Sequence, residues 1–152
     1  RWQLAAWTVD STVSPVYASG PFVFVGGGLT AAGAGATKVE AGQVTAGGQL
    51  AAFDDAPKDM GATEAGYGVC AANGQLFTFG GLNASPSSGA QSATLVSPAP
   101  GLAGSSWNNE GLTMIHGRYL LGSAVQSSFI FLLGGQTDEP SAASKTTELV
   151  IW

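Results

Sequence analysis

Carboxylate side chains are the residues of this sequence whose type and spacing best suit a chemical role. The stretch "FDDAPKD", which begins at Phe53, and the stretch "WNNEG", which begins at Trp107, lie 54 positions apart and both carry acidic residues. Carboxylate oxygens suit calcium, but the spacing matches no EF-hand loop, and acids in loops are commonly just solvated. Calcium binding and a solvated acidic surface therefore both stay open. The candidate ligand face consists of Asp54, Asp55, Asp59, Glu110, Asp138 and Glu139.

Other reactive side chains are few. The single histidine, His116, lies in the connection "MIHGRY", where a surface or capping role is usual. The single cysteine, Cys70, lies in an apolar stretch, which predicts a buried and inert thiol. No His or Cys spacing indicates a zinc or copper site, and the glycine clusters at 26–28 and 33–35 lack the lysine of a phosphate-binding loop. The sequence therefore predicts no catalytic residue, no cofactor and no enzyme.

The elements that position the acids follow from an internal repeat. Short apolar runs end in glycine pairs that begin at Gly26, Gly80 and Gly134, 54 residues apart each time. A short continuous apolar run that ends at glycines predicts a strand covered on both faces. We therefore expect Val25, Phe79 and Leu133 to occupy equivalent buried positions.

Each repeat unit is predicted to contain four antiparallel strands. Strands are expected before each glycine pair ("PVYAS", "GYGVCAA", "RYLLGSAV"), after it ("TKVEAGQV", "SATLVS", "TTELVIW") and near the next aromatic residue ("QLAAF", "LAGSSW"). In such a unit, the loop from the second to the third strand and the connection to the next unit emerge on the same side. Eight of the ten acids then share one side, namely the candidate ligand face together with Asp10 and Glu64. A unit of this length and strand number is typical of a propeller blade.

The repeat resembles the kelch repeat, in which an apolar strand ends in Gly-Gly and an aromatic residue lies on the outer strand. The double glycine occurs three times, and the outer aromatic occurs as Trp7, Phe53 and Trp107. Arg118 resembles the kelch arginine that opens the innermost strand, although only one unit keeps it and the usual third-strand tyrosine is missing. The resemblance covers essentially the whole chain and implies a kelch-like β-propeller of a divergent, bacterial type. It implies binding and scaffolding far more often than catalysis.

Three blades are expected: about 9–53, about 66–107 and about 118–152, the last completed by a strand equivalent to residues 2–8. Because propellers have about four to eight blades, three cannot close a ring. The ring is expected to reach six blades in one of two ways. Either two copies associate, with residues 2–8 of each pairing with residues 146–152 of the other, or a longer chain supplies more blades. A start at Arg1 without methionine indicates a processed chain or a fragment.

The composition limits the classes of partner that the protein is expected to bind. The net charge is −5 and the five basic residues are scattered, which argues against nucleic acid. No apolar run reaches the roughly 18 residues that span a bilayer, so no membrane span is expected. The leading hypothesis is an extracellular or cell-surface binding or structural module that holds a protein or small ligand on its loop face. The alternatives are a carbohydrate-active enzyme or sugar-binding propeller that uses the acidic face, and a self-assembling structural subunit.

Overall fold

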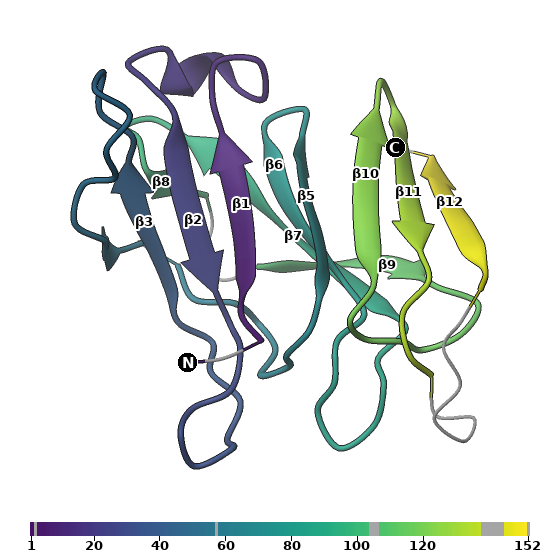
Figure 1. Ribbon diagram of the computed structural model, residues 1–152. Coiled ribbons are helices and arrows are strands. Elements are labelled where there is room, and N and C mark those ends of the chain that lie inside the picture. Colours follow the sequence, from purple (N-terminus) through teal and green to yellow (C-terminus); the bar gives the residue numbers. More distant parts are fainter. Residues whose placement is uncertain (2, 57, 104–106, 138–144, 152) are drawn as a thin grey trace.

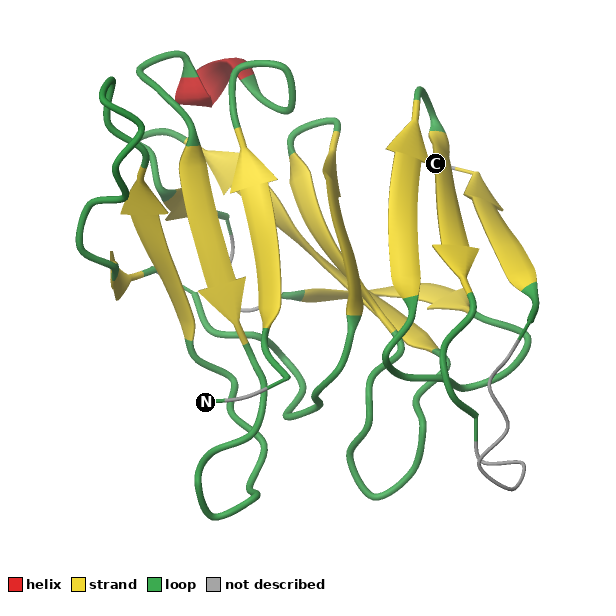
Figure 2. Ribbon diagram, viewed as in Figure 1, coloured by secondary structure: helices red, strands yellow, loops and turns green. Residues whose placement is uncertain are grey.

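The chain is built almost entirely from strands. The computed structural model describes residues 1, 3–56, 58–103, 107–137 and 145–151. These residues contain twelve strands in three antiparallel sheets, with a 3₁₀ turn at Pro15–Tyr17 and no α-helix (Figure 1, Figure 2). The predicted all-β fold is therefore confirmed.

Each sheet is formed by consecutive strands. Sheet 1 has the order β1-β2-β3-β4, with β1 (Ala5–Val9), β2 (Phe22–Gly26), β3 (Val39–Gln43) and β4 (Asp54–Asp55). Sheet 2 has the order β5-β6-β7-β8, with β9 also paired to β7; the strands are β5 (Gly68–Ala72), β6 (Gln75–Phe79), β7 (Gly89–Val96), β8 (Gly101–Leu102) and β9 (Asn108–Thr113). Sheet 3 has the order β10-β11-β12, with β10 (Gly122–Gln126), β11 (Phe129–Leu133) and β12 (Thr147–Ile151). The first strands β1, β5 and β10 contact one another along the chain order of the sheets.

The glycine pairs mark the repeat, but the first repeat is offset by one residue from the predicted alignment. Gly26, Phe79 and Leu133 are equivalent, because each lies opposite the first residue of the preceding strand. The glycines with positive φ are then Gly27–Gly28, Gly80–Gly81 and Gly134–Gly135. Three consecutive glycines at 26–28 permit two alignments in the sequence. The backbone selects the second, since only glycine adopts this left-handed conformation without strain.

The sheets stack face to face. We call the face of a sheet that is turned toward the next sheet along the chain its forward face, and the opposite one its rear face. The forward face of sheet 1 packs on the rear face of sheet 2, with Phe24 and Leu76 buried between them. The forward face of sheet 2 packs on the rear face of sheet 3, with Phe77 and Ile130 buried between them. Because side chains alternate along a strand, β6 must be apolar on both faces.

The two outer sheets each leave one face without a neighbouring sheet. Phe79, in the middle sheet, is 1% exposed as expected, but Leu133, on the forward face of sheet 3, is 45% exposed. Val25, on the rear face of sheet 1, is only partly buried. The predicted burial of all three residues is therefore wrong for Val25 and Leu133.

The expectation that residues 2–8 pair with another copy is wrong for the residues that form β1. This strand pairs with β2 of the same chain, in a register that runs from Ala5 opposite Gly26 to Val9 opposite Phe22. The Trp7 ring is buried between sheets 1 and 2, and its Nε1 donates a hydrogen bond of 2.9 Å to the Phe77 carbonyl. Burial of the indole therefore fixes β1 as the first strand of sheet 1.

The stretch "PVYAS", predicted as that first strand, forms the 3₁₀ turn instead. Pro15 begins the turn, where its missing N–H and fixed φ favour a helical start. Tyr17 then turns inward and packs edge-on against Phe22 and Phe24, at ring-centroid distances of 5.3 and 6.1 Å. The loop 10–21 thus caps one end of sheet 1 (Figure 2).

The fourth strands lie later in the sequence than expected. The stretch 49–53 closes a hairpin through a single bridge between Leu50 and Val44, and the fourth strand of sheet 1 is β4. In sheet 2 the corresponding strand is β9, which pairs with β7. Within the described residues, sheet 3 has no fourth strand. As predicted, the loops between the second and third strands of sheets 1 and 2 share one end of the sheets with the crossovers that follow β4 and β9 (lower edge of Figure 1).

Candidate functional site

The acidic residues of the candidate ligand face are distributed over strands and connections. Asp54 and Asp55 form β4 itself, and Glu110 lies within β9. Asp59 lies in the crossover from sheet 1 to sheet 2. Asp10 follows β1, at the opposite end of the sheet from this crossover, so its predicted place is wrong. Asp138 and Glu139 lie outside the described residues.

Most of these acids have local partners. Lys38 Nζ donates to Asp55 Oδ2 at 2.6 Å, and this hydrogen bond raises the pKa of Lys38. Glu110 accepts a hydrogen bond from the Ser92 hydroxyl, and Asp59 Oδ1 accepts one from the Val39 N–H at 3.4 Å. In the part of the chain that the structure describes, no group of three or more His, Cys, Asp or Glu side chains is placed to hold a metal ion. The described acids therefore form separate contacts rather than one cluster.

A groove beside β4 is the part of the predicted ligand face best shaped to bind a molecule. Its volume is about 770 Å³, and it lies between the outer strands of sheet 1 and the β7–β8 hairpin of sheet 2. Asp54, Asp55 and Lys58 line it together with apolar residues such as Phe22 and Leu102. Charges of both signs beside an apolar surface suit an amphipathic peptide or a small polar ligand. They form no pair of acid and base poised for catalysis.

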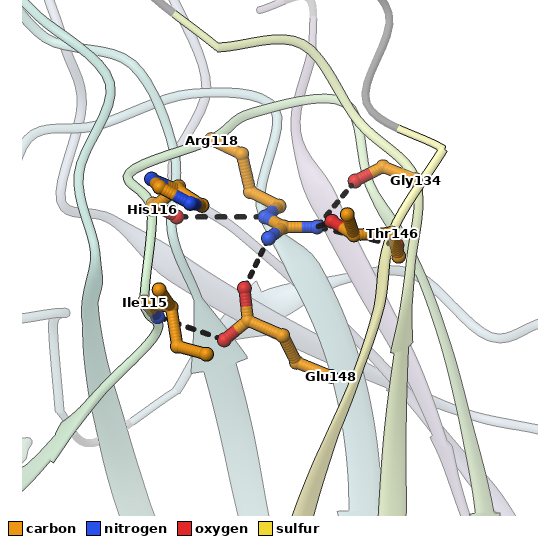
Figure 3. A network of polar contacts seen from close by, with 6 residues as sticks. All are labelled: Ile115, His116, Arg118, Gly134, Thr146 and Glu148. Atoms are coloured by element: carbon orange, nitrogen blue, oxygen red, sulfur yellow. Dashed lines mark hydrogen bonds and ion pairs between the residues drawn. The ribbon is translucent and has the colours of Figure 1, made fainter.

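Arg118 is the centre of the densest polar network (Figure 3). It is fully buried, and it forms an ion pair with Glu148 of β12. Its Nη1 donates to the Gly134 carbonyl at 3.1 Å and to Thr146 Oγ1 at 3.0 Å. Glu148 Oε2 in turn accepts a hydrogen bond of 2.9 Å from the Ile115 N–H.

The network joins three segments that are far apart in sequence. Arg118 lies in the crossover from sheet 2 to sheet 3, Gly134 directly follows β11, and Glu148 lies in β12. A buried guanidinium requires a carboxylate and several acceptors, because an unpaired buried charge is strongly destabilising. All the guanidinium contacts named here are with protein atoms. Arg118 therefore holds these three segments together rather than binding a ligand. Sequence reasoning singled out Arg118 but missed Glu148, whose polar place in the otherwise apolar "ELVI" was the available signal.

The remaining reactive side chains do not form a catalytic arrangement. His116 is exposed, and its backbone carbonyl accepts from Arg118 Nε at 3.5 Å. Cys70 is partly buried against the core between sheets 2 and 3, and burial raises the pKa of its thiol to about 12. Burial also raises the pKa of Tyr17 to about 12. The Cys70 thiol and the Tyr17 hydroxyl are therefore protonated and unreactive near neutral pH.

No family model matches this sequence, and no curated protein matches it. The fold is similar to that of the solved structure of YjhT, with a TM-score of 0.64 and 15% sequence identity over 86% of this chain. The chain spans only 40% of that protein's length. At this level of identity the likeness shows the fold alone. No helix among the described residues is long and apolar enough to cross a membrane.

Proposed function

We propose that this chain is a segment of a kelch-like β-propeller that acts as a binding or structural module outside the cell or at its surface. Its three sheets are the blades, and a second copy of the chain completes a six-bladed ring. Three repeats of strand, glycine pair, loop and strand support this proposal, as does the stacking of successive sheets. Low lysine content and abundant glycine suit an extracellular protein. The absence of a catalytic arrangement in the described residues favours binding over catalysis.

Exposed apolar side chains on the two end faces are the observation that carries the proposal, and the rear face of sheet 1 also carries the charged residues Glu40 and Asp55. On the forward face of sheet 3, three large apolar side chains are exposed: Phe129 by 40%, Leu133 by 45% and Leu149 by 52%. On the rear face of sheet 1, Leu50 is 45% exposed and lies over Gly42, whose added Cβ would meet Leu50 Cδ1 at 3.3 Å. Exposed apolar patches of this kind mark interaction surfaces.

The two open faces, the forward face of sheet 3 and the rear face of sheet 1, are the two kinds of face that pack together inside the chain. Within the chain, each interface joins the forward face of one sheet to the rear face of the next. The faces left open are one forward face and one rear face, so a second copy offers the same pairing at both ends. Such a head-to-tail contact gives a closed ring of two copies if each sheet is rotated from the one before it by the angle that a six-bladed ring requires. This closure uses face packing, unlike the strand exchange that the sequence predicts.

Phe53 and Trp107 illustrate the missing neighbour. Each directly precedes the fourth strand of its sheet, and they are 54 residues apart. Trp107 is 5% exposed because its ring contacts Trp7 of the preceding sheet, at a centroid distance of 5.4 Å. Phe53 is 37% exposed, and no sheet precedes its own. A second copy would supply that neighbour.

Light scattering coupled to size-exclusion chromatography tests this assembly. We expect a mass about twice that of the 15.2 kDa chain. The substitution Leu149→Lys places a charge on the forward face of sheet 3 and should yield monomers. Ile115→Lys is the matched control, because Ile115 is 82% exposed in the crossover and lies on no sheet face.

The result also separates the two ways of completing the ring. A wild-type chain that is monomeric at every concentration would refute closure by a second copy, and would leave closure by further blades of a longer chain. Dimers that survive Leu149→Lys would show that the forward face of sheet 3 is not the interface.

A further inference from the structure

The polar network of Arg118 has a counterpart in sheet 1. Arg1 forms an ion pair with Glu40 of β3, and its Nη1 donates a hydrogen bond of 2.7 Å to the carbonyl of Lys38, the residue before β3. Arg118 likewise pairs with a carboxylate of β12 and donates to the carbonyl of the residue before that strand. Sheets 1 and 3 therefore share this arrangement.

The backbone shows which residue of sheet 2 corresponds to these arginines. The Gly66 N–H donates to the Gln3 carbonyl, and the Leu120 N–H donates to the Gly66 carbonyl. Gln3, Gly66 and Leu120 are therefore equivalent, since each pairs with its counterpart in the neighbouring unit. The residues two positions earlier are equivalent as well, namely Arg1, Glu64 and Arg118. Sheet 2 thus has a glutamate where sheets 1 and 3 have an arginine.

The acceptors that surround the Arg118 guanidinium also have counterparts in sheet 2. The acceptors belong to His116, Gly134, Thr146 and Glu148 (Figure 3). The strand registers, the backbone hydrogen bonds and the chain order give their counterparts as Ala62, Gly80, Gly89 and Gln91. All four counterparts, and Glu64 itself, line one cleft of about 490 Å³, a volume usual for small-molecule sites. This cleft therefore corresponds to the space that the guanidinium fills in sheet 3.

The Glu64 side chain does not fill this space. A Cβ added at Gly135 would lie 3.4 Å from Arg118 Cδ. A Cβ added at Gly81, the equivalent glycine, would lie 3.0 Å from Glu64 Oε2. The carboxylate of Glu64 thus lies level with the aliphatic stem of Arg118, because a glutamate side chain is the shorter of the two. The space beyond it, which corresponds to the guanidinium, is left to the cleft.

The cleft is accessible and carries negative charge. Among its lining residues, Gly61 and Asn109 are exposed, and Glu64 and Ser87 are partly exposed. The Glu64 carboxylate is hydrogen-bonded to the side chain of Ser87. In the described part of the chain, Glu64 forms no ion pair, and no Lys, Arg or His lines the cleft. A cationic group that enters the cleft therefore meets a carboxylate that has no counter-charge of its own.

We propose that this cleft binds the guanidinium of an arginine side chain from a partner protein, in the place that Arg118 fills in sheet 3. The bound guanidinium forms an ion pair with Glu64 and donates to the backbone carbonyls of Gly80 and Gly89. Gly80 and Gly134 share the same left-handed backbone, with φ of 65° and 62°. We therefore expect the Gly80 carbonyl to be oriented like the Gly134 carbonyl, which accepts from Arg118.

Charge and shape favour an arginine side chain over other ligands. A phosphate or a carboxylate would meet the Glu64 carboxylate, and a single carboxylate makes a poor metal site. An ammonium group is a compact point charge, whereas a planar guanidinium reaches a carboxylate and several carbonyls at once. The α-carboxylate of free arginine would be repelled by Glu64, which favours an arginine within a polypeptide. The inference rests on the binding role proposed above, but not on closure of the ring.

Nuclear magnetic resonance of the isotope-labelled chain tests the site with small probes. N-acetylarginine amide carries the guanidinium without a free carboxylate, and N-acetylcitrulline amide is its neutral isostere. We expect the arginine probe to shift the amide signals of Gly80 and Gly89 saturably. It should bind at least about tenfold more tightly than the citrulline probe, which cannot form the ion pair. Free arginine should also bind more weakly than the arginine probe.

Substitutions then separate this site from general attraction to an acidic protein. Glu64→Gln removes the charge with little change of size, and should weaken binding of the arginine probe about tenfold without lowering the thermal midpoint. Asp10→Asn is the matched control, because it removes one negative charge at the opposite end of sheet 1 and Asp10 does not line the cleft. It should leave the affinity unchanged. The double substitution Glu64→Arg with Gln91→Glu rebuilds the arrangement of sheet 3 in sheet 2, so it should fill the cleft and abolish binding.

Each outcome bears on the proposal. An arginine probe that moves neither glycine signal, or that binds no more tightly than the citrulline probe, would overturn it. Equal weakening by Glu64→Gln and Asp10→Asn would overturn it too, as would undiminished binding by the folded double variant. Equal affinity for free arginine would assign the cleft to the amino acid rather than to a partner protein. Binding of the probe by a monomeric chain would remove ring closure alone, whereas a dimer that does not bind the probe would remove this site alone.

Discussion

Removing the Glu148 carboxylate should be among the most damaging single changes to the fold. Glu148 is the ion-pair partner of Arg118, whose side chain is 0% exposed. Glu148→Ala removes the counter-charge that this buried guanidinium has among the described residues, and it leaves the Ile115 N–H without its described acceptor. Breaking a buried pair in this way typically costs about 3–5 kcal/mol of the free energy of unfolding. The double substitution Arg118→Met with Glu148→Leu should cost less than Glu148→Ala alone, because it removes both charges together.

Urea unfolding followed by tryptophan fluorescence measures these differences, since Trp7 and Trp107 are buried beside each other. The control is Asp55→Ala, which breaks the ion pair between Lys38 and Asp55, whose side chains are 46% and 67% exposed. Exposed pairs contribute little, so no measurable change is expected there. If Glu148→Ala lowered the free energy of unfolding no more than Asp55→Ala did, the buried ion pair of Arg118 and Glu148 would not stabilise the fold as we infer.

Three further predictions concern the core, Glu64 and calcium. Phe77→Ala should lower the free energy of unfolding by about 3–5 kcal/mol, because Phe77 is fully buried between two sheets. The control is Phe129→Ala, and both substitutions are measured on the monomeric Leu149→Lys background. If Phe77→Ala had no larger effect than Phe129→Ala, sheets 2 and 3 would not be stacked as described. Burial raises the pKa of Glu64 above its ordinary value of 4.5, so its contribution to stability is present below that value and is lost as the pH rises through the raised pKa. Glu64→Gln should therefore raise the thermal midpoint at about pH 7 but not at about pH 4, and a gain of equal size at both would exclude this cause. Added calcium should leave the thermal midpoint equal to that in chelator, since the described acids do not converge; a higher midpoint in calcium would instead indicate a metal site.

The sequence predicts the repeat and the apolar second strands because these depend on local signals. A continuous apolar run such as that of β6, followed by two glycines, can be read without knowledge of its neighbours. The register of the first repeat could not be read in this way, because the three glycines at 26–28 permit two alignments. Only pairing with β1 distinguishes them, and that pairing is a contact between distant residues.

The errors at the N-terminus have one physical cause. In sequence, "RWQLAAWT" resembles "GQLAAF", and likeness alone predicts that both are fourth strands. The structure uses neither in that role: Trp7 is buried in the core between sheets 1 and 2, while Leu50 lies in a hairpin. Burial of an indole against another sheet is a tertiary effect, which outweighs local resemblance. The same holds for the polar network of Arg118, because Glu148 becomes notable only when its contact with this distant arginine is known.

Placing β1 in sheet 1 of its own chain changes how a ring can be completed. Each described strand pairs with at least one strand of its own chain, and β1 is already paired with β2, so association needs no exchange of β1 between copies. The contact between copies then depends on the packing of sheet faces, centred on apolar residues such as Leu133 and Leu149. Each interface inside the chain has the same character, and there the connection between sheets removes most of the entropy cost of association. The contact between copies lacks this advantage, so it should be the first interface to open on dilution, and it should leave folded monomers behind.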